Sequence, residues 1–164
     1  MVRDLEEKDV QVLDTEEDLE NLPEGQGTVI IRSHGVSPSC LRYLKFPWGK
    51  CGRCHLPFCK KIHKIVDEHS RAGEAVIIIG SPVHPEVEGI RGWGNGDTVV
   101  VENEADAEDY NLPEGKKLCI VSQTTFNYNK FQELVEKISK KGYDSSVLNT
   151  ICNATQERQV EAAG

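Results

Sequence analysis

The sequence predicts an α/β protein built around parallel strands. Short apolar runs rich in Val and Ile recur along the chain, and segments with helical spacing lie between them. Continuous apolar runs are typical of strands buried on both faces of a parallel sheet, because helices cover both sides of such a sheet. We expect strands at the following segments: Val10–Leu13, Thr28–Arg32, Ala75–Gly80, Thr98–Val101, Lys117–Val121 and Ser146–Leu148.

Two longer segments between these strands have the period of an amphipathic helix. Phe58–Arg71 places its apolar side chains on one face, and Gly73 follows where a helix would end. Tyr128–Lys141 repeats the pattern, with Gly142 after it. Peripheral helical turns are predicted at the acidic segments Thr15–Asn21 and Glu104–Asp109. Each acidic segment precedes the tetrapeptide Leu-Pro-Glu-Gly, and this repetition favours two similar α/β units.

The composition and net charge of the chain argue against several classes of function. A chain of 164 residues with 38% hydrophobic and 28% charged residues can form one ordinary domain with some surplus. The net charge of −8 and the lack of a basic block argue against nucleic-acid binding. No run approaches the roughly 18 apolar residues of a membrane span, and the acidic N-terminus is unlike a signal peptide. Six cysteines then favour thiol chemistry in a reducing compartment, so we expect a cytoplasmic protein.

Polar turns follow the predicted strands where each strand ends. They are Arg32–Gly35, Gly80–Gly89, Ser122–Thr125 and Asn149–Thr155. The carboxyl ends of parallel strands meet at one edge of a sheet, where α/β proteins place their ligands. Histidines, hydroxyls and turn amides at that edge could hold a phosphate group, and Glu86 could transfer a proton. Any one of these turns would more often be structural, but together they favour a functional site.

These turns carry four motifs, which together resemble the 4-hydroxy-3-methylbut-2-enyl diphosphate reductase (LytB/IspH) family over nearly the whole chain. The motifs are Ser33-His-Gly-Val36, His84-Pro-Glu-Val-Glu-Gly89, Ser122-Gln-Thr-Thr125 and Ile151-Cys-Asn-Ala-Thr-Gln-Glu-Arg-Gln159. The resemblance implies an iron–sulfur oxidoreductase of the methylerythritol phosphate pathway. Its [4Fe-4S] cluster is held by three cysteines, and two electrons plus protons remove the substrate hydroxyl as water. The products are isopentenyl and dimethylallyl diphosphates, and the electron donor is of the ferredoxin or flavodoxin type.

The resemblance also implies a role for individual residues. By position, Glu86 corresponds to the proton donor, His34 and His84 to diphosphate-binding histidines, Thr124 to a hydroxyl that contacts the substrate, and Cys152 to a cluster ligand. These residue types suit the chemistry, because thiolates hold iron and an imidazole can pair with phosphate oxygens.

The family fold implies three similar units, each a small parallel sheet flanked by helices, around a central cluster. We therefore expect residues 1–56 to form part of a first domain with a disrupted C-terminal part, residues 57–148 a complete central domain, and residues 149–164 the start of a third. The chain would be an internal fragment, because it carries neither the family's first cluster cysteine nor its Ser-x-Asn diphosphate motif. Exposed surface between domains would then lower its stability.

One segment departs from the family pattern. The family's middle cluster cysteine lies in an Asp-Ala-Thr-Cys-Pro-Phe-Val motif, and here Leu56 occupies the cysteine position. If residues 53–60 were encoded CGA TGC CAC CTG CCC TTT TGT AAA, reading one base later would restore that motif in full. We therefore hypothesise that about Cys40 to Leu56 is a frame-shifted segment. The coding DNA tests this hypothesis, because it shows whether the shifted reading frame encodes the family motif.

Two other functions stay open from the residues alone. The spacing of Cys51, Cys54, Cys59 and His63 fits a small zinc-binding module, since thiolates with one imidazole suit tetrahedral zinc. Alternatively, the chain is a non-catalytic remnant, because Cys152 alone occupies a family ligand position and a single thiolate does not hold a cubane cluster. Cys54 or Cys59 could replace the missing middle ligand only by movement of the loop. We expect the isolated chain to be inactive and not to hold the cluster stably.

Overall fold

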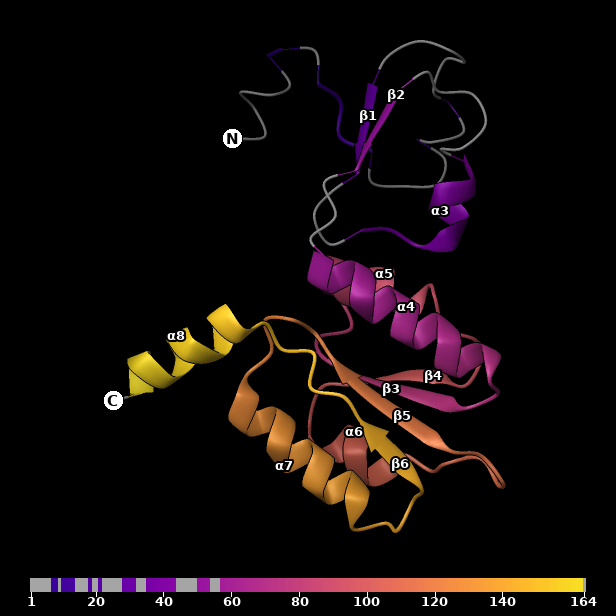
Figure 1. The fold of residues 1–164 in the computed structure, drawn as a ribbon, viewed down its shortest axis with the longest axis vertical. Coiled ribbons are helices and arrows are strands. Elements are labelled where there is room, and N and C mark those ends of the chain that lie inside the picture. The colour runs from indigo at the N-terminus through magenta and orange to yellow at the C-terminus, as the bar shows by residue number, and fades with distance from the viewer. Residues whose placement is uncertain are drawn as a thin grey trace.

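The computed structural model describes residues 7–8, 10–13, 18, 21, 28–31, 35–43, 50–53 and 57–163 (Figure 1). Helices and strands alternate along the described chain, as the sequence predicts. Their order is β1 (Thr28–Ile31), α3 (Pro38–Tyr43), β2 (Lys50–Arg53), α4 (Pro57–Arg71), β3 (Ala75–Ile79), α5 (Pro85–Arg91), β4 (Thr98–Val101), α6 (Glu104–Asp109), β5 (Leu118–Ser122), α7 (Tyr128–Ser139), β6 (Ser145–Val147) and α8 (Asn153–Ala163).

A four-stranded parallel sheet forms the centre of the fold, with strand order β4-β3-β5-β6. Val76 of β3 pairs with Thr98 of β4 on one side and with Cys119 of β5 on the other. Strands β1 and β2 form a separate parallel pair. The parallel sheet confirms the predicted α/β class, and its strands end together at one edge.

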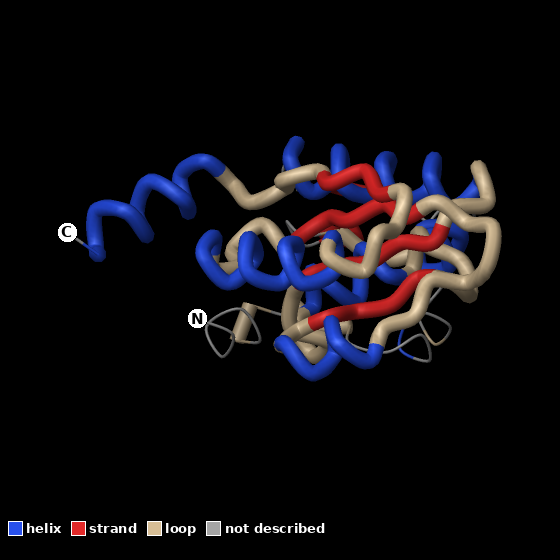
Figure 2. The backbone as a smooth tube through the Cα atoms, turned by 90° about the horizontal axis from the view of Figure 1, so that it is seen from below, coloured by secondary structure: helices blue, strands red, loops and turns tan. Residues whose placement is uncertain are grey.

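Each face of this sheet is buried under its own pair of helices (Figure 2). Ala75, Ile77 and Ile79 of β3 pack with α6 and α7, whereas Val76 and Ile78 pack with α4 and α5. All five residues of β3 are fully buried, with relative exposures of 0%. Successive side chains of a strand point to opposite faces, so a continuous apolar run supplies both cores.

The helix ends follow the sequence signals. Gly73 after α4 and Gly142 after α7 adopt φ values of 81° and 76°, the left-handed conformation in which a helix commonly ends. Asn127 begins α7 by accepting a hydrogen bond from the backbone N–H of Lys130 at 3.0 Å. Such a cap satisfies one of the amide groups that the first turn leaves without a partner.

The structure corrects the prediction at the N-terminal side. Val10–Leu13 is not a strand, and Val10 and Val12 are 42% and 51% exposed. A short apolar run becomes a strand only where a neighbouring strand and a core receive it. The segment Thr15–Asn21 falls mostly outside the described residues. Strand β2 was not predicted, because Lys50-Cys-Gly-Arg53 has neither the apolar content nor the β-branched residues of a buried strand.

None of the helices in the described part of the chain is long and apolar enough to span a bilayer.

Candidate active site at the carboxyl edge of the sheet

The loops after β3 and β5 are joined where the two strands end. Ile79 of β3 lies in register with Ser122 of β5, and the N–H of Gln123 donates to the carbonyl of Ile79 at 2.8 Å. The side chain of Gln123 continues the connection. Its Oε1 accepts from the N–H of Ser81 at 3.1 Å, and its Nε2 donates to Oγ1 of Thr125 at 2.9 Å. Two of the predicted turns, those after β3 and β5, are therefore joined at this edge of the sheet.

Glu86 lies in the first turn of α5 and is completely buried, with 0% exposure. Its Oε1 accepts a hydrogen bond from the N–H of Thr124 at 3.1 Å, and the thiol of Cys59 lies 3.9 Å from the same oxygen. Within the described part of the chain, Oε2 of Glu86 has no hydrogen-bond partner. A buried carboxyl oxygen without a partner is uncommon, and a catalytic role is one of the explanations for such a group.

His84 caps the same helix. Its Nδ1 accepts from the backbone N–H of Glu86 at 3.1 Å, and the side chain is half-buried. Because Nδ1 accepts, the proton of the neutral ring lies on Nε2, which makes Nε2 a donor. This tautomer suits the binding of an anionic ligand, and the cap orients the ring at the carboxyl edge.

Thr124 connects Glu86 with Cys152 through its backbone. Its N–H donates to Glu86, and its carbonyl accepts from the N–H of Cys152 at 2.9 Å. Cys152 is half-buried and directly precedes α8, which leaves the body of the fold in Figure 1. A titratable carboxyl, a backbone turn and a thiol from three separate segments therefore meet at one place.

Cys59 is a further thiol at this edge, in the first turn of α4. Burial raises the pKa of Cys59 to about 11, and the charge and hydrogen bond of Glu86 and the charge of Cys152 act in the same direction. The thiol is therefore protonated at neutral pH in the metal-free chain, and binding to a metal would require the loss of that proton. Sequence reasoning treated Cys59 only as a zinc ligand or a replacement ligand. Its contact with Glu86 joins segments 27 positions apart, and no spacing rule signals it.

Other predicted site residues have different surroundings or fall outside the description. His34, Cys54 and Leu56 are not among the described residues. His63 is 3% exposed and stacks on Trp93, with ring centroids 5.5 Å apart. Trp93 in turn donates from Nε1 to the carbonyl of Val36 at 3.2 Å, which joins the segment before α3 to the turn after α5.

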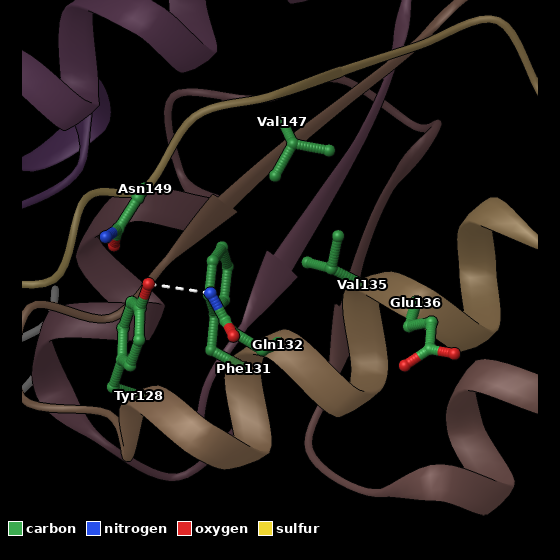
Figure 3. Close-up of a pocket in the computed structure, with 7 residues that line it drawn as sticks. All are labelled: Tyr128, Phe131, Gln132, Val135, Glu136, Val147 and Asn149. Carbon is green, nitrogen blue, oxygen red and sulfur yellow. Dashed lines mark hydrogen bonds between the residues drawn. The ribbon is translucent and has the colours of Figure 1, made fainter.

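A pocket of about 410 Å³ lies between α7 and β6 (Figure 3), and Glu86 is not among the residues that line it. Gln132 donates to the hydroxyl of Tyr128 at 2.6 Å along its rim. The pocket is lined by Tyr128, Phe131, Gln132, Val135, Glu136, Val147 and Asn149. It contains one carboxylate and no cation, so it is unsuited to a diphosphate.

A known protein family matches the whole chain. The family described as LytB protein matches residues 1–164. The chain belongs to the LytB family. A LytB relative from Caldanaerobacter subterraneus subsp. tengcongensis, named 4-hydroxy-3-methylbut-2-enyl diphosphate reductase, is 41% identical over 163 residues, which are 99% of this chain and 55% of the relative. A relative of the same name from Clostridioides difficile is 35% identical and covers 92% of this chain and 53% of its own length.

Solved structures of the LytB family have the same fold. The E-1-hydroxy-2-methyl-but-2-enyl-4-diphosphate reductase from Plasmodium falciparum superimposes with a TM-score of 0.78 at 31% identity, over 88% of this chain and 46% of that one. A second structure, described as (E)-4-hydroxy-3-methyl-but-2-enyl diphosphate reductase, the terminal enzyme of the non-mevalonate pathway, gives 0.74 at 33% identity over 96% and 55%. The chain thus spans about half the length of the relatives it matches.

The residues described in this LytB chain do not by themselves fit a [4Fe-4S] cluster. No three His, Cys, Asp or Glu side chains in the described stretches lie where they could share a metal ion. Two described thiols lie at this edge, Cys59 beside Glu86 and Cys152 beside Thr124. Cys119, which is fully buried in the sheet, packs in the core. A cubane needs several thiolates, so the described thiols at this edge do not hold one by themselves.

Proposed function

We propose that the chain carries the central part of a 4-hydroxy-3-methylbut-2-enyl diphosphate reductase, with residues 57–148 as its complete domain and residues 1–56 and 149–164 as parts of its neighbours. The supporting observation is the buried carboxyl of Glu86, which is joined through Thr124 to Cys152 at the carboxyl edge of the sheet. This arrangement is suited to the delivery of a proton beside a thiol ligand.

Each described residue then has a definite task. The Glu86 carboxyl is the proton donor for the departing hydroxyl, because its unpartnered Oε2 is sheltered from bulk water. His84 donates from Nε2 to the diphosphate, and its helix cap fixes the direction of the ring. Thr124 contacts the substrate with its hydroxyl, while its backbone holds Glu86. His34 completes the diphosphate site by analogy with its motif.

The reductive part of the reaction belongs to the complete enzyme. A ferredoxin- or flavodoxin-type donor would supply electrons in the cytoplasm, and isopentenyl and dimethylallyl diphosphates would be the products. The chain offers Cys152 as a ligand, and Cys59 is a poor replacement for the missing one because it is buried and its thiol lies against Glu86. We therefore propose that the chain on its own is not an active reductase.

A segment exchange tests this function. Residues 57–163 replace the matching segment of the Caldanaerobacter reductase, with the recipient's own cluster cysteine kept at the position of Leu56, and reductase turnover is measured anaerobically with reduced methyl viologen. We expect activity, and we expect Glu86→Gln in the exchanged segment to lower kcat by about 100-fold or more, because that is the usual contribution of a general acid.

Glu74→Gln is the matched control. Glu74 lies before β3, at the opposite edge of the sheet, where it contacts Nδ1 of His69 at 2.6 Å. This variant should retain the activity of the unmodified exchange. A folded exchange protein without activity, or full activity in Glu86→Gln, would contradict the proposed function.

A further inference from the structure

The segment after β6 continues to follow β5 although β6 ends at Val147. The N–H of Leu148 donates to the carbonyl of Ile120 at 2.9 Å, and the N–H of Cys152 donates to the carbonyl of Thr124 at 2.9 Å. Between these two backbone bonds, the side chain of Thr150 contacts Ser122. Residues 148, 150 and 152 are therefore tied to residues 120, 122 and 124 in turn.

In the middle one of these three contacts, the side chain of Thr150 bonds to Ser122 as the backbone of a neighbouring strand would. We call these contacts of Thr150 with Ser122 the Thr150 tie. Oγ1 of Thr150 accepts from the N–H of Ser122 at 2.8 Å and donates to the carbonyl of Ser122 at 2.6 Å. Oγ1 also lies 3.1 Å from Oγ of Ser122. A threonine hydroxyl has one proton, and the carbonyl receives it, so the Ser122 hydroxyl is the donor in this third contact. One side chain thus satisfies both backbone groups of a residue at the end of the sheet.

The two residues of the Thr150 tie are buried. Thr150 is 4% exposed and Ser122 is 0% exposed. Ile151, 2% exposed, packs into the core under α7, and its N–H donates to Oδ1 of Asn149 at 3.0 Å. Water cannot readily replace the hydroxyl of Thr150 in this environment, so its loss would leave the Ser122 N–H and carbonyl without partners.

We propose that Thr150 is a positioning residue that sets the place of Cys152 at the carboxyl edge of the sheet. The side chain fixes the turn two residues before the thiol, and the Cys152 N–H then binds the same loop that holds Glu86. The importance of this for catalysis rests on the proposed function, in which Cys152 is a cluster ligand. The tie itself is a property of the folded chain and can be measured without cluster or substrate.

Alkylation of individual cysteines tests the tie in the full chain. The rate of iodoacetamide modification of Cys152 is measured by peptide mass spectrometry for the parent, Thr150→Val and Thr150→Ser. Valine keeps the shape and removes the hydroxyl, so we expect Cys152 to react about tenfold faster. Serine keeps the hydroxyl, so we expect a rate within about twofold of the parent. Cys119, buried in β5, reports whether the whole fold has opened.

Thr98→Val is the matched control. Thr98 is 6% exposed in β4, and its Oγ1 finds no hydrogen-bond partner among the described residues. This variant should leave the Cys152 rate unchanged. Equal Cys152 rates in Thr150→Val and the parent, or a serine variant that behaves like valine, would overturn the proposal.

If Thr150→Val unfolds, Cys119 also reacts and alkylation no longer reports on the tie. Amide hydrogen exchange of the parent chain then provides the test. Opening of the Thr150 tie exposes the N–H of Ser122 and frees the turn that holds the N–H of Cys152. In low urea we expect these two amides to exchange through one opening with the same urea dependence. Exchange of the Cys152 amide through an opening that leaves Ser122 protected would refute the tie, whatever the fate of the reductase function.

Discussion

The Glu86 side chain shows how a single residue can be held at some cost to stability. One of its oxygens is satisfied by the N–H of Thr124, whereas the other is buried without a described partner. An unsatisfied buried oxygen costs about 1–3 kcal/mol. A fold tolerates such a cost where the group is needed for chemistry, and the neighbouring cap by His84 holds the helix that carries it.

Cys59 gives a prediction about alkaline pH. Its pKa is raised from 9.0 to about 11 in the folded chain, so the folded state favours the protonated thiol. The contribution of this thiol to the free energy of unfolding is fully present below pH 9 and is lost as the pH rises toward 11. We expect Cys59→Val to lose less stability than the parent between these pH values, as measured by urea midpoints at pH 8, 9 and 10.

Cys119→Val is the companion variant for that measurement. Burial, followed by the charge of Glu74, raises the pKa of Cys119 to about 12, so its removal should also flatten the alkaline loss of stability. Identical pH dependence in the parent and in Cys59→Val would show that the thiol of Cys59 is not held as described.

Sequence reasoning placed some residues of this edge and missed others. Glu86, Thr124 and Cys152 follow predicted strands, and parallel strands bring their ends together, so their proximity was foreseeable. Cys59 was not foreseeable as a member of the edge. Thr150 lies in a predicted turn, but its contacts with Ser122 were not foreseeable. Their contacts depend on where α4 and the turn after β6 come to lie, and no periodicity or motif encodes those positions.

The end of β3 packs so closely on its neighbours that only glycine fits at position 80. A Cβ there would lie 2.9 Å from Cβ of Gln123 and 2.9 Å from Cγ2 of Val87. We expect Gly80→Ala to destabilise the chain by about 1–3 kcal/mol, since β5 or α5 must shift to admit the methyl group. Urea unfolding followed by circular dichroism measures the loss.

Gly96→Ala is the control for this element. A Cβ at position 96 meets nothing within 4 Å, so the substitution should change the unfolding free energy by no more than about 0.5 kcal/mol. Equal stability of the two variants would mean that the contact between the strand ends is looser than described.

Elements were predictable where burial and pattern agree. The Val/Ile runs of β3 and β4 and the helical period of α4 satisfy both local preference and the two cores. Val10–Leu13 shares the apolar composition but is exposed, and β2 forms with Lys, Cys, Gly and Arg because β1 pairs with it. In both cases the tertiary surroundings outweigh the local preference of the residues.

The described part of the molecule is built on a parallel sheet with a core on each face, and the proposed site lies at one edge of that sheet. Its cores lie on both sides of β3 and β5, whereas the edge gathers residues from α4, α5 and the turns after β5 and β6. The fold therefore does not depend on a metal for its core, and its stability and its ability to hold a cluster are separable.

Anaerobic reconstitution tests that separation. The chain is incubated with iron and sulfide, and the cluster is quantified by iron, sulfide and absorbance near the iron–sulfur band. We expect well below one [4Fe-4S] cluster per chain together with a folded circular dichroism spectrum. The Caldanaerobacter reductase, treated in parallel, should take up its cluster. A stoichiometric cluster in the present chain would contradict the prediction.

Strand order also determines what the growing chain exposes during synthesis. Of the four strands in this sheet, β3 is synthesised first. β4 then pairs with one of its edges, and the other edge stays unpaired until Leu118–Ser122 of β5 has been made. Until then the apolar run Ala75–Ile79 presents an open edge of unpaired amides and carbonyls, which is a template for pairing with another chain. Slower translation between residues 101 and 118 would prolong this exposure, so aggregation in the cell would depend on ribosome speed there as well as on equilibrium stability.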